Sequence, residues 1–227
     1  MNKLLLTKAH LTEAEKSQLQ ALGFEVIVQS FIHFEAVDFT LPVDRDFQWI
    51  FFSSPRAFDF FSKGVSSTIL QEKKIACIGR KTAEHISNKG IACDFIGQRS
   101  GEVKTVAQDF KSLVKTDTVL FPISQRSNQS MQAELRENQI INLQVYTTLS
   151  KLIHLTTEAD FLVFTSPSNA EAYLKQYTIN PTQKIIAWGS TTKSYLESLN
   201  YTCLFTLEES SVESLAFELG QRPELLA

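Results

Sequence analysis

The sequence of 227 residues has few of the residues that build cross-links and metal centres. Its three cysteines, Cys77, Cys93 and Cys203, are an odd number, and their spacing fits neither a zinc site nor a disulfide framework. Each lies in an apolar run, so we expect all three to be buried strand residues. The four histidines are scattered, without an HxxxH pair or a nearby group of carboxylates. The sequence therefore indicates no metal site and no catalytic Cys–His pair.

Excess basic charge and long apolar runs are also missing. The formal net charge is −3 and the pI is about 5.9, which leaves no general basic field for a nucleic acid. No apolar stretch approaches the roughly 20 residues of a membrane helix. The first residues lack the apolar core and cleavage site of a signal peptide. We expect a cytoplasmic protein that binds neither nucleic acid nor membrane and holds any anionic ligand through local groups.

Glycine is scarce as well, with eight residues that form no phosphate-binding loop. Gly79 and Gly189 each stand alone in a predicted strand-to-helix turn, which fits neither a GxGxxG nor a Walker sequence. These features count against a nucleotide-dependent enzyme. A G-x-S-x-G elbow and a tightly spaced pair of acids are also missing, so the sequence indicates no strong catalytic dyad.

What the sequence does contain is a recurring α/β pattern. Short apolar runs are followed by a turn and an amphipathic stretch, which predicts parallel strands with crossover helices. Ten such runs begin near Leu4, Glu25, Trp49, Ile75, Cys93, Val119, Asn142, Phe161, Ile185 and Cys203.

Part of this pattern occurs twice. Residues 50–57 (IFFSSPRA) resemble residues 162–169 (LVFTSPSN), 112 positions later. Residues 75–82 (IACIGRKT) resemble residues 185–192 (IIAWGSTT), 110 positions later, and Cys93 and Cys203 keep that offset. Three landmarks in one order at nearly one offset indicate an internal duplication.

The duplication predicts how the chain is divided. The first copy runs through five strands, whereas only three follow residue 161, so the two N-terminal strands complete the second set. We therefore expect a continuous α/β domain of residues 36–147 and a discontinuous α/β domain of residues 1–33 and 150–227. The crossings, around residues 31–37 and 146–153, alternate apolar and polar residues and predict an extended two-strand connector.

Candidate ligand-binding groups lie where predicted strands end and helices begin. Ser54-Pro55 and Ser166-Pro167 each place a capping hydroxyl before a first-turn proline, and Thr12-x-x-Glu15 is a capping box. Helix starts at the carboxyl ends of parallel strands attract carboxylates through backbone amides. For any single residue a plain helix cap, or a solvated surface charge, is the alternative. Recurrence in both copies favours binding by Ser53, Ser54, Arg56, Thr82, Thr165, Ser166, Ser168, Thr191 and Thr192.

Six short motifs follow one another along essentially the whole sequence: Ser53-Ser54-Pro55-Arg56-Ala57, Ile78-Gly79-x-x-Thr82, Leu120-Phe121-Pro122, Val145-Tyr146-Thr147, Phe164-Thr165-Ser166-Pro167-Ser168 and Gly189-x-Thr191-Thr192. In these motifs, their order and their spacing, the sequence resembles the uroporphyrinogen-III synthase family. The resemblance implies two flavodoxin-like domains with parallel sheets, joined by a two-strand connector, with the linear tetrapyrrole hydroxymethylbilane bound between them and no cofactor. We expect a monomer that acts in porphyrin and heme biosynthesis, with the preceding pathway enzyme as a partner.

The resemblance also implies a reaction. In the family, loss of the terminal hydroxyl gives an azafulvene, and attack by the last pyrrole gives a spiro intermediate that reopens and closes with that ring inverted. It places Tyr146 near the leaving hydroxyl as the catalytic residue, a hydrogen-bond donor or weak acid. The sequence departs from the family at Arg80-Lys81 and at Ser124-Gln125-Arg126-Ser127, where a glycine-containing turn is usual. The alternative is a non-catalytic module that binds a tetrapyrrole or another anionic ligand.

Overall fold

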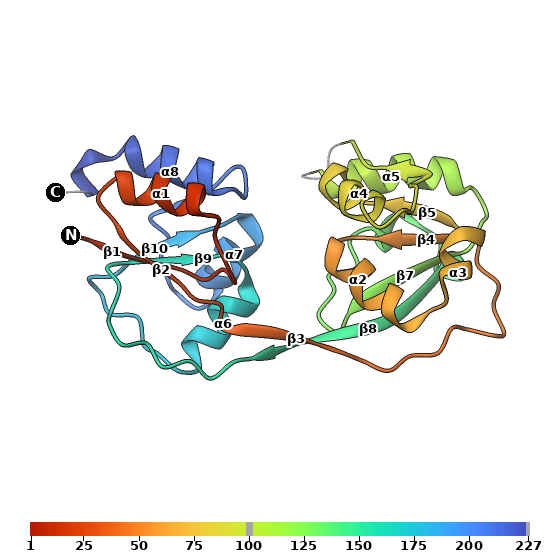
Figure 1. Cartoon of the computed structure of the whole chain (residues 1–227), viewed down its shortest axis with the longest axis horizontal. Coiled ribbons are helices and arrows are strands. Elements are labelled where there is room, and N and C mark those ends of the chain that lie inside the picture. The colour runs from red at the N-terminus through yellow and green to blue at the C-terminus, as the bar shows by residue number, and fades with distance from the viewer. Residues whose placement is uncertain (99–101, 226–227) are drawn as a thin grey trace. The chain divides into compact units, whose positions relative to one another are not determined.

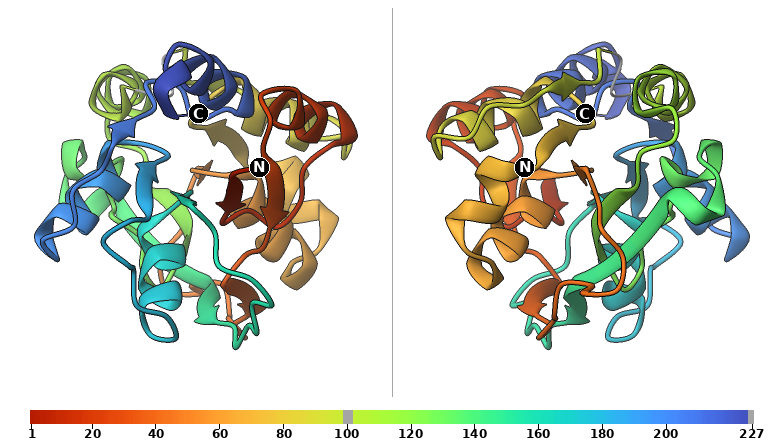
Figure 2. Two further views of the ribbon diagram at one scale, coloured as in Figure 1. Left: turned by 90° about the vertical axis from the view of Figure 1, so that its left-hand side faces the viewer. Right: turned by 90° about the vertical axis from the view of Figure 1, so that its right-hand side faces the viewer.

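The computed structural model describes residues 1–98 and 102–225. The chain divides into two compact units. Unit 1 consists of Met1–His33 and Leu149–Ala227, and unit 2 consists of Phe34–Thr148. Each unit has its own sheet with helices on both faces, as Figures 1 and 2 show.

The sheet of unit 1 has five parallel strands in the order β11-β10-β9-β1-β2. Numbered by their order within the unit, the strands lie 2-1-3-4-5, which is the flavodoxin-like arrangement. The strands are β1 (Lys3–Leu6), β2 (Glu25–Val28), β9 (Phe161–Phe164), β10 (Lys184–Ala187) and β11 (Phe205–Thr206).

Both faces of this sheet are covered, which explains why its strands read as continuous apolar runs. Leu4 and Leu6 face the helices α1 (Glu13–Ala21) and α8 (Val212–Gly220), whereas Leu5 faces α6 (Pro167–Leu174) and α7 (Ser190–Ser198). All three leucines are completely buried, and burial of each contributes about 1.5–3 kcal/mol. The short η3 turn (Pro223–Leu225) follows α8.

The sheet of unit 2 has six strands in the order β3-β8-β7-β4-β5-β6. The helices α2 (Pro55–Gly64), α3 (Ser67–Glu72) and α4 (Arg80–Ser87) cover one face, and α5 (Val103–Val114) covers the other. The 3-10 turns η1 (Gln132–Glu134) and η2 (Glu137–Gln139) precede β8. The strands are β3 (Ile32–Ala36), β4 (Trp49–Phe52), β5 (Lys74–Cys77), β6 (Phe95–Ile96), β7 (Val119–Ser124) and β8 (Ile140–Ser150).

Apart from β3, the two sheets have the same arrangement with different starting points along the chain. The order β11-β10-β9-β1-β2 in unit 1 corresponds to β6-β5-β4-β7-β8 in unit 2. The two N-terminal strands thus fill the places that β7 and β8 fill in unit 2. The α/β fold with parallel sheets that the sequence predicts is confirmed.

The connector consists of β3 and the end of β8. The backbone N–H of Lys151 donates to the carbonyl of Phe31 at 2.7 Å, and that of Val37 donates to the carbonyl of Val145 at 3.1 Å. Residue numbers rise along one strand as they fall along the other, so the two strands are antiparallel. They are the two crossings between the units.

The prediction for the cysteines is wrong for two of the three. Cys77 is buried at the end of β5, but Cys93 and Cys203 are half-buried and precede β6 and β11. These edge strands pair with their neighbours over two residues each. The apolar side chains before them therefore pack against the core from outside the sheet ladder.

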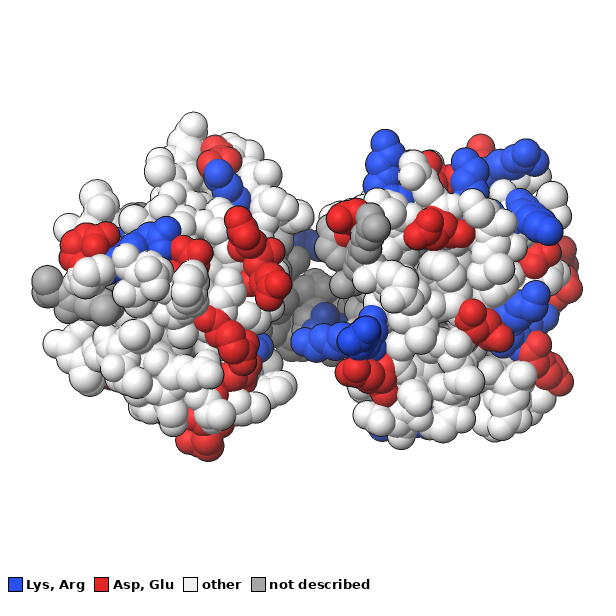
Figure 3. Space-filling view, turned by 90° about the horizontal axis from the view of Figure 1, so that it is seen from above, with Lys and Arg blue, Asp and Glu red and all other residues white. Residues whose placement is uncertain are grey.

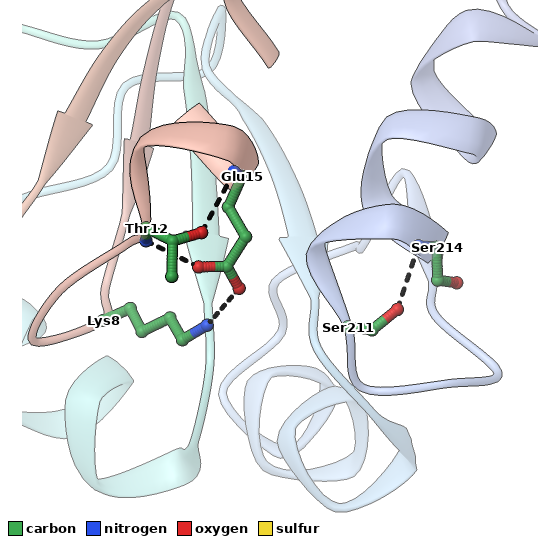
Figure 4. Close-up of polar contacts among 5 residues, drawn as sticks. All are labelled: Lys8, Thr12, Glu15, Ser211 and Ser214. Carbon is green, nitrogen blue, oxygen red and sulfur yellow. Dashed lines mark hydrogen bonds and ion pairs between the residues drawn. The ribbon is translucent and has the colours of Figure 1, made fainter. Parts of the chain in front are cut away.

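Helix starts follow the predicted capping signals. In α1 the Thr12 hydroxyl accepts from the Glu15 N–H at 3.2 Å, and the Glu15 carboxylate accepts from the Thr12 N–H at 2.7 Å (Figure 4). This hydrogen bond from Thr12, with Lys8 at 3.1 Å, lowers the pKa of Glu15. Ser54 and Ser166 cap α2 and α6 in the same way, each followed by proline. In the described residues no helix is long and apolar enough to cross a membrane, since the longest, α5, has 12 residues.

Candidate functional site

Each sheet has one place where the strand order reverses, and ligands of doubly wound proteins bind beyond the carboxyl ends of the strands there. In unit 2 this switch point lies between β4 and β7, and in unit 1 between β9 and β1. The duplicated motif follows β4 as Ser53-Ser54 and follows β9 as Thr165-Ser166. The sequence therefore brings its candidate residues to the expected edge of each sheet.

At the switch point of unit 2 lies a cavity of about 360 Å³. Residues after β4, the end of β7, Tyr146 of β8 and the segment that follows β7 form its walls. The lining residues are Ser53, Ser54, Arg56, Ile78, Val103, Phe121, Pro122, Ile123, Ser124, Arg126, Ser127, Asn128, Gln129, Ser130, Met131, Gln132 and Tyr146.

The cavity exists because β4 and β7 separate early. Their pairing ends at Ile50 and Leu120, and Pro122 has no N–H with which to continue the ladder. In unit 1 the corresponding strands, β1 and β9, stay paired for longer. Thr7 directly follows β1 and corresponds to Pro122. It donates its N–H to the carbonyl of Val163 at 3.0 Å. A proline at one position thus opens the sheet edge in unit 2.

Tyr146 reaches the cavity through a β-bulge in β8. Ile123 pairs with Gln144 but Ser124 pairs with Tyr146, so Val145 is an extra residue. A bulge turns neighbouring side chains toward one face, and Val145 and Tyr146 are accordingly both buried in the same core cluster. A regular strand would have directed them to opposite faces.

Two aromatic rings fix the orientation of the Tyr146 ring. Phe60 of α2 stacks on it with ring centres 5.1 Å apart, and Phe34 of β3 meets it edge-on at 6.0 Å. The tyrosine is 9% exposed and lines the cavity. Its phenol position is therefore set by packing within unit 2.

Two basic side chains line the cavity. Arg56 and Arg126 line it, and none of the described lining residues is acidic. The guanidinium carbon of Arg56 lies 3.5 Å from the centre of the Phe34 ring, a cation–π contact that restricts where this charge can go. Guanidinium groups bind carboxylates through paired hydrogen bonds, and serine hydroxyls add further donors. The chemistry of the cavity suits a carboxylate-bearing ligand.

One wall of the cavity is the loop of residues 126–132, which follows β7 and has a restricted conformation. Gln129 has a φ of 51°, in the left-handed region that few residues other than glycine adopt. Asn142 of β8 donates to the Gln129 side chain at 3.1 Å and accepts from the Gln132 side chain at 3.0 Å. These amide contacts hold the loop against β8.

At the switch point of unit 1 the strand-end side chains form hydrogen bonds with one another. Thr165 donates its N–H to the Thr7 hydroxyl at 2.9 Å and its hydroxyl to the Thr7 carbonyl. The amide of Asn169 donates to the hydroxyls of Thr165 and Ser166, both at 3.3 Å. Asn169 holds the helix position that Ala57 holds in unit 2, where no such donor is present. Two predicted ligand residues, Thr165 and Ser166, thus make hydrogen bonds inside unit 1.

The remaining predicted residues lie at strand ends but outside the unit 2 cavity. Thr82 and Thr192 are 3% and 4% exposed, and each donates its N–H to the glycine carbonyl three residues earlier at 3.1 Å. Ser168 is half-buried and Thr191 is exposed. The structure gathers Ser53, Ser54, Arg56 and Tyr146 around one cavity.

Sequence reasoning missed most of the cavity wall. Pro122, Ser124 and Ser130 line it, as does Asn128. The available signal was the run of hydroxyl and amide residues after β7, of which residues 124–127 stand out only as a departure from the family pattern.

On the face drawn in Figure 3, basic and acidic residues are interspersed on each unit. Among the described residues, no group of three His, Cys, Asp or Glu side chains could hold a metal ion.

Several known proteins are similar to this chain in sequence or in fold. A uroporphyrinogen-III synthase from Chlorobaculum parvum is 24% identical over 221 residues, covering 88% of this chain and 90% of the relative. The crystal structure of uroporphyrinogen-III synthetase from Helicobacter pylori has a TM-score of 0.69 at 18% identity, covering 98% of this chain and 100% of that one. A mutant uroporphyrinogen-III synthase from Thermus thermophilus has a TM-score of 0.62 at 14% identity, covering both chains fully. These two structures show that the fold is shared.

The family is shown by the sequence itself. The family model of uroporphyrinogen-III synthase HemD matches residues 13–222, which is most of the chain and includes segments of both units. Since this match runs through the end of β4, the end of β7 and Tyr146, the chain belongs to the uroporphyrinogen-III synthase family.

Proposed function

We propose that this uroporphyrinogen-III synthase, a cyclising lyase, holds carboxylates of hydroxymethylbilane in the cavity between β4 and β7. The observation that carries the proposal is the lining, which combines Arg56, Arg126 and several serines with Tyr146 and no acid among the described residues. The substrate has acetate and propionate groups on each pyrrole ring. Such groups accept hydrogen bonds from guanidinium and hydroxyl donors.

The size of the cavity limits what it holds. At about 360 Å³ it is at the lower end of the roughly 300–1,000 Å³ that ligand pockets occupy. We therefore propose that it takes one part of the tetrapyrrole. The other carboxylates would bind at the remaining strand ends, where the sequence predicts Thr82, Thr165, Ser166, Ser168, Thr191 and Thr192 as ligands.

Tyr146 is proposed as the residue that assists departure of the hydroxyl. Its phenol donates a hydrogen bond, or a proton, to the terminal hydroxyl while the C–O bond breaks. Electrons from the pyrrole nitrogen expel the hydroxyl, which takes up a proton from the phenol or from solvent and leaves as water. The pyrrole N–H releases a proton as the neutral azafulvene forms, and this proton restores the donor, so that one water is lost in all. Because Phe60 and Phe34 hold the tyrosine ring, the donor is oriented before the reaction begins.

The main task of the enzyme is to favour the ring closure that inverts the last pyrrole ring. Free hydroxymethylbilane cyclises without the enzyme to the isomer whose last ring is not inverted. Fixed carboxylate sites restrict how the two ends of the chain can meet. The chemistry requires donors and orientation only, so we propose that no cofactor takes part.

The setting of the protein is also a proposal. We infer a cytoplasmic monomer that receives its reactive substrate from the preceding pathway enzyme. We further propose that the two units fold as separate domains, residues 1–33 with 150–227 and residues 36–147, because each has its own core clusters.

The proposed function is tested by adding the protein to freshly generated hydroxymethylbilane and separating the oxidised uroporphyrin isomers. We expect the inverted isomer to dominate, whereas a blank gives the uninverted one. Product no richer in the inverted isomer than the blank would contradict the assignment. Tight retention of a porphyrinogen without turnover would instead support a binding module.

A further inference from the structure

Residues of α6 and of the turn after it hold the two segments through which the connector joins unit 1, and the first contact is made near the start of α6. The side-chain oxygen of Asn169 accepts from the backbone N–H of Phe31 at 2.9 Å and from the hydroxyl of Ser30 at 3.4 Å. Asn169 is 4% exposed and Phe31 is fully buried. A buried backbone N–H needs a partner, and here an amide side chain supplies it.

The segment that follows the second connector strand, residues 151–155, is held by residues just beyond the end of α6. Gln176 accepts from the N–H of Ile153 and donates to the carbonyl of Lys151, both at 2.8 Å. The Tyr177 hydroxyl donates to the carbonyl of Ile153 at 2.6 Å and accepts from the N–H of Leu155 at 2.8 Å. Four hydrogen bonds from two neighbouring side chains thus hold residues 151–155.

Asn169 also joins the connector to the strand-end motif. Its side-chain nitrogen donates to the hydroxyls of Thr165 and Ser166, while its oxygen binds Phe31. All of these residues belong to unit 1. One side chain therefore links the turn after β9 to the residue from which the connector leaves.

In unit 2 the corresponding helix meets the connector differently. Ala57 replaces Asn169, and α2 contacts β3 and β8 through Arg56 on Phe34 and Phe60 on Tyr146. Stacked rings tolerate sliding, whereas hydrogen bonds to backbone groups fix direction. At its unit 2 end the connector continues a sheet strand, since β8 pairs with β7, whereas at its unit 1 end side-chain hydrogen bonds hold it.

We propose that Asn169, Gln176 and Tyr177 form a connector anchor, a set of positioning residues that fixes the direction in which the connector leaves unit 1. The anchor thereby helps to decide which ring closure occurs. This inference rests on the proposed function, because it assumes that groups in both units bind the same substrate. The three residues act through the backbone of the connector and do not themselves react.

The test compares Asn169→Ala and Gln176→Ala with Lys175→Ala. Asn169→Ala is tolerated by the helix start, because α2 begins with Ser54, proline and Ala57 in the same capped geometry. Lys175 forms a surface pair with Glu171 at 2.6 Å and is the matched control. Enzyme is added in an amount at which spontaneous cyclisation of the substrate is negligible. The isomer ratio, kcat and KM are measured together with hydrogen exchange at Phe31 and Ile153.

For both anchor variants we expect at least a fivefold rise in the ratio of uninverted to inverted isomer and a lower kcat, with KM changed less than twofold. Exchange should accelerate at Phe31 in Asn169→Ala and at Ile153 in Gln176→Ala. Asn169→Asp keeps an oxygen for the Phe31 N–H and should restore most of the isomer ratio, which a general loss of folding would not allow. Lys175→Ala should behave as wild type.

An unchanged isomer ratio in the anchor variants would overturn the inference and leave the proposed function standing. A wild-type protein that fails to form the inverted isomer would instead refute the proposed function. If Asn169→Ala does not fold, Asn169→Asp and Gln176→Ala decide the question by the same measurements.

Discussion

At the scale of single residues, two exchanges between equivalent positions distinguish the switch points of the two units. Pro122 stands where Thr7 stands in unit 1, and Ala57 stands where Asn169 stands. The proline ends a ladder, and the alanine leaves the strand-end hydroxyl of Ser53 facing a cavity. The duplication therefore preserved the strands and helices, whereas the polar side chains after β4 and those after β9 make different contacts.

The Tyr146 hydroxyl is the group whose chemical role can be isolated most directly. In Tyr146→Phe we expect kcat to fall about 10- to 100-fold, because one donor to the leaving hydroxyl is lost. The free energy of unfolding should change by less than about 1.5 kcal/mol, since the stacked ring remains. Steady-state kinetics and chemical denaturation check both values. An unchanged kcat would make Tyr146 a packing residue.

At the scale of elements, local sequence signals predicted where helices begin better than where strands end. The Ser-Pro pairs and the capping box act within one turn, so their hydrogen bonds are implied by four neighbouring residues. The bulge at Val145 and the late start of β6 depend on partner strands, which no local pattern describes. The cavity wall was missed for the same reason, because it forms where β4 and β7 separate.

The capping box of α1 gives a prediction at this scale. Thr12→Ala should lower the free energy of unfolding by about 0.5–2 kcal/mol, because the Glu15 N–H loses its acceptor. Thermal or chemical denaturation at neutral pH measures this change. Ser17, an exposed residue of the same helix without a capping role, offers Ser17→Ala as the control.

The same box predicts a pH dependence. The pKa of Glu15 lies below its usual 4.5 in the folded protein, chiefly because its carboxylate accepts from the Thr12 N–H. The charged form therefore stabilises the fold above the pKa of the unfolded chain, and this contribution is lost as the pH falls through the folded pKa. The stability difference between wild type and Glu15→Gln should be largest near pH 7 and shrink in acid. A difference that stays constant down to acid pH would contradict the role of the charge.

At the scale of the whole molecule, the sequence predicted the fold because duplication is visible in the order of motifs. The first copy has five strands, and the second reaches five only if the two N-terminal strands join its three. This count implies that both chain ends meet in one sheet, and in the structure β1 pairs with β9. The candidate site was harder to predict, because the same Ser-Pro motif lines a cavity in unit 2 and accepts hydrogen bonds from Asn169 in unit 1. The difference arises from contacts across 158 residues, between Thr7 and Thr165, and no short motif records it.

Because the chain divides into two units, we predict that a mutation can destabilise one unit without destabilising the other. Leu120 in β7 and Leu162 in β9 are both fully buried leucines in central strands, one in each unit. Replacing either by alanine should cost about 2–5 kcal/mol in its own unit through lost burial and a cavity. If the units are separate cooperative domains, hydrogen exchange at the slowest amides should accelerate in unit 2 for Leu120→Ala and in unit 1 for Leu162→Ala. Equal acceleration in both units by either variant would mean that the chain unfolds as one, with the connector transmitting stability between the two cores.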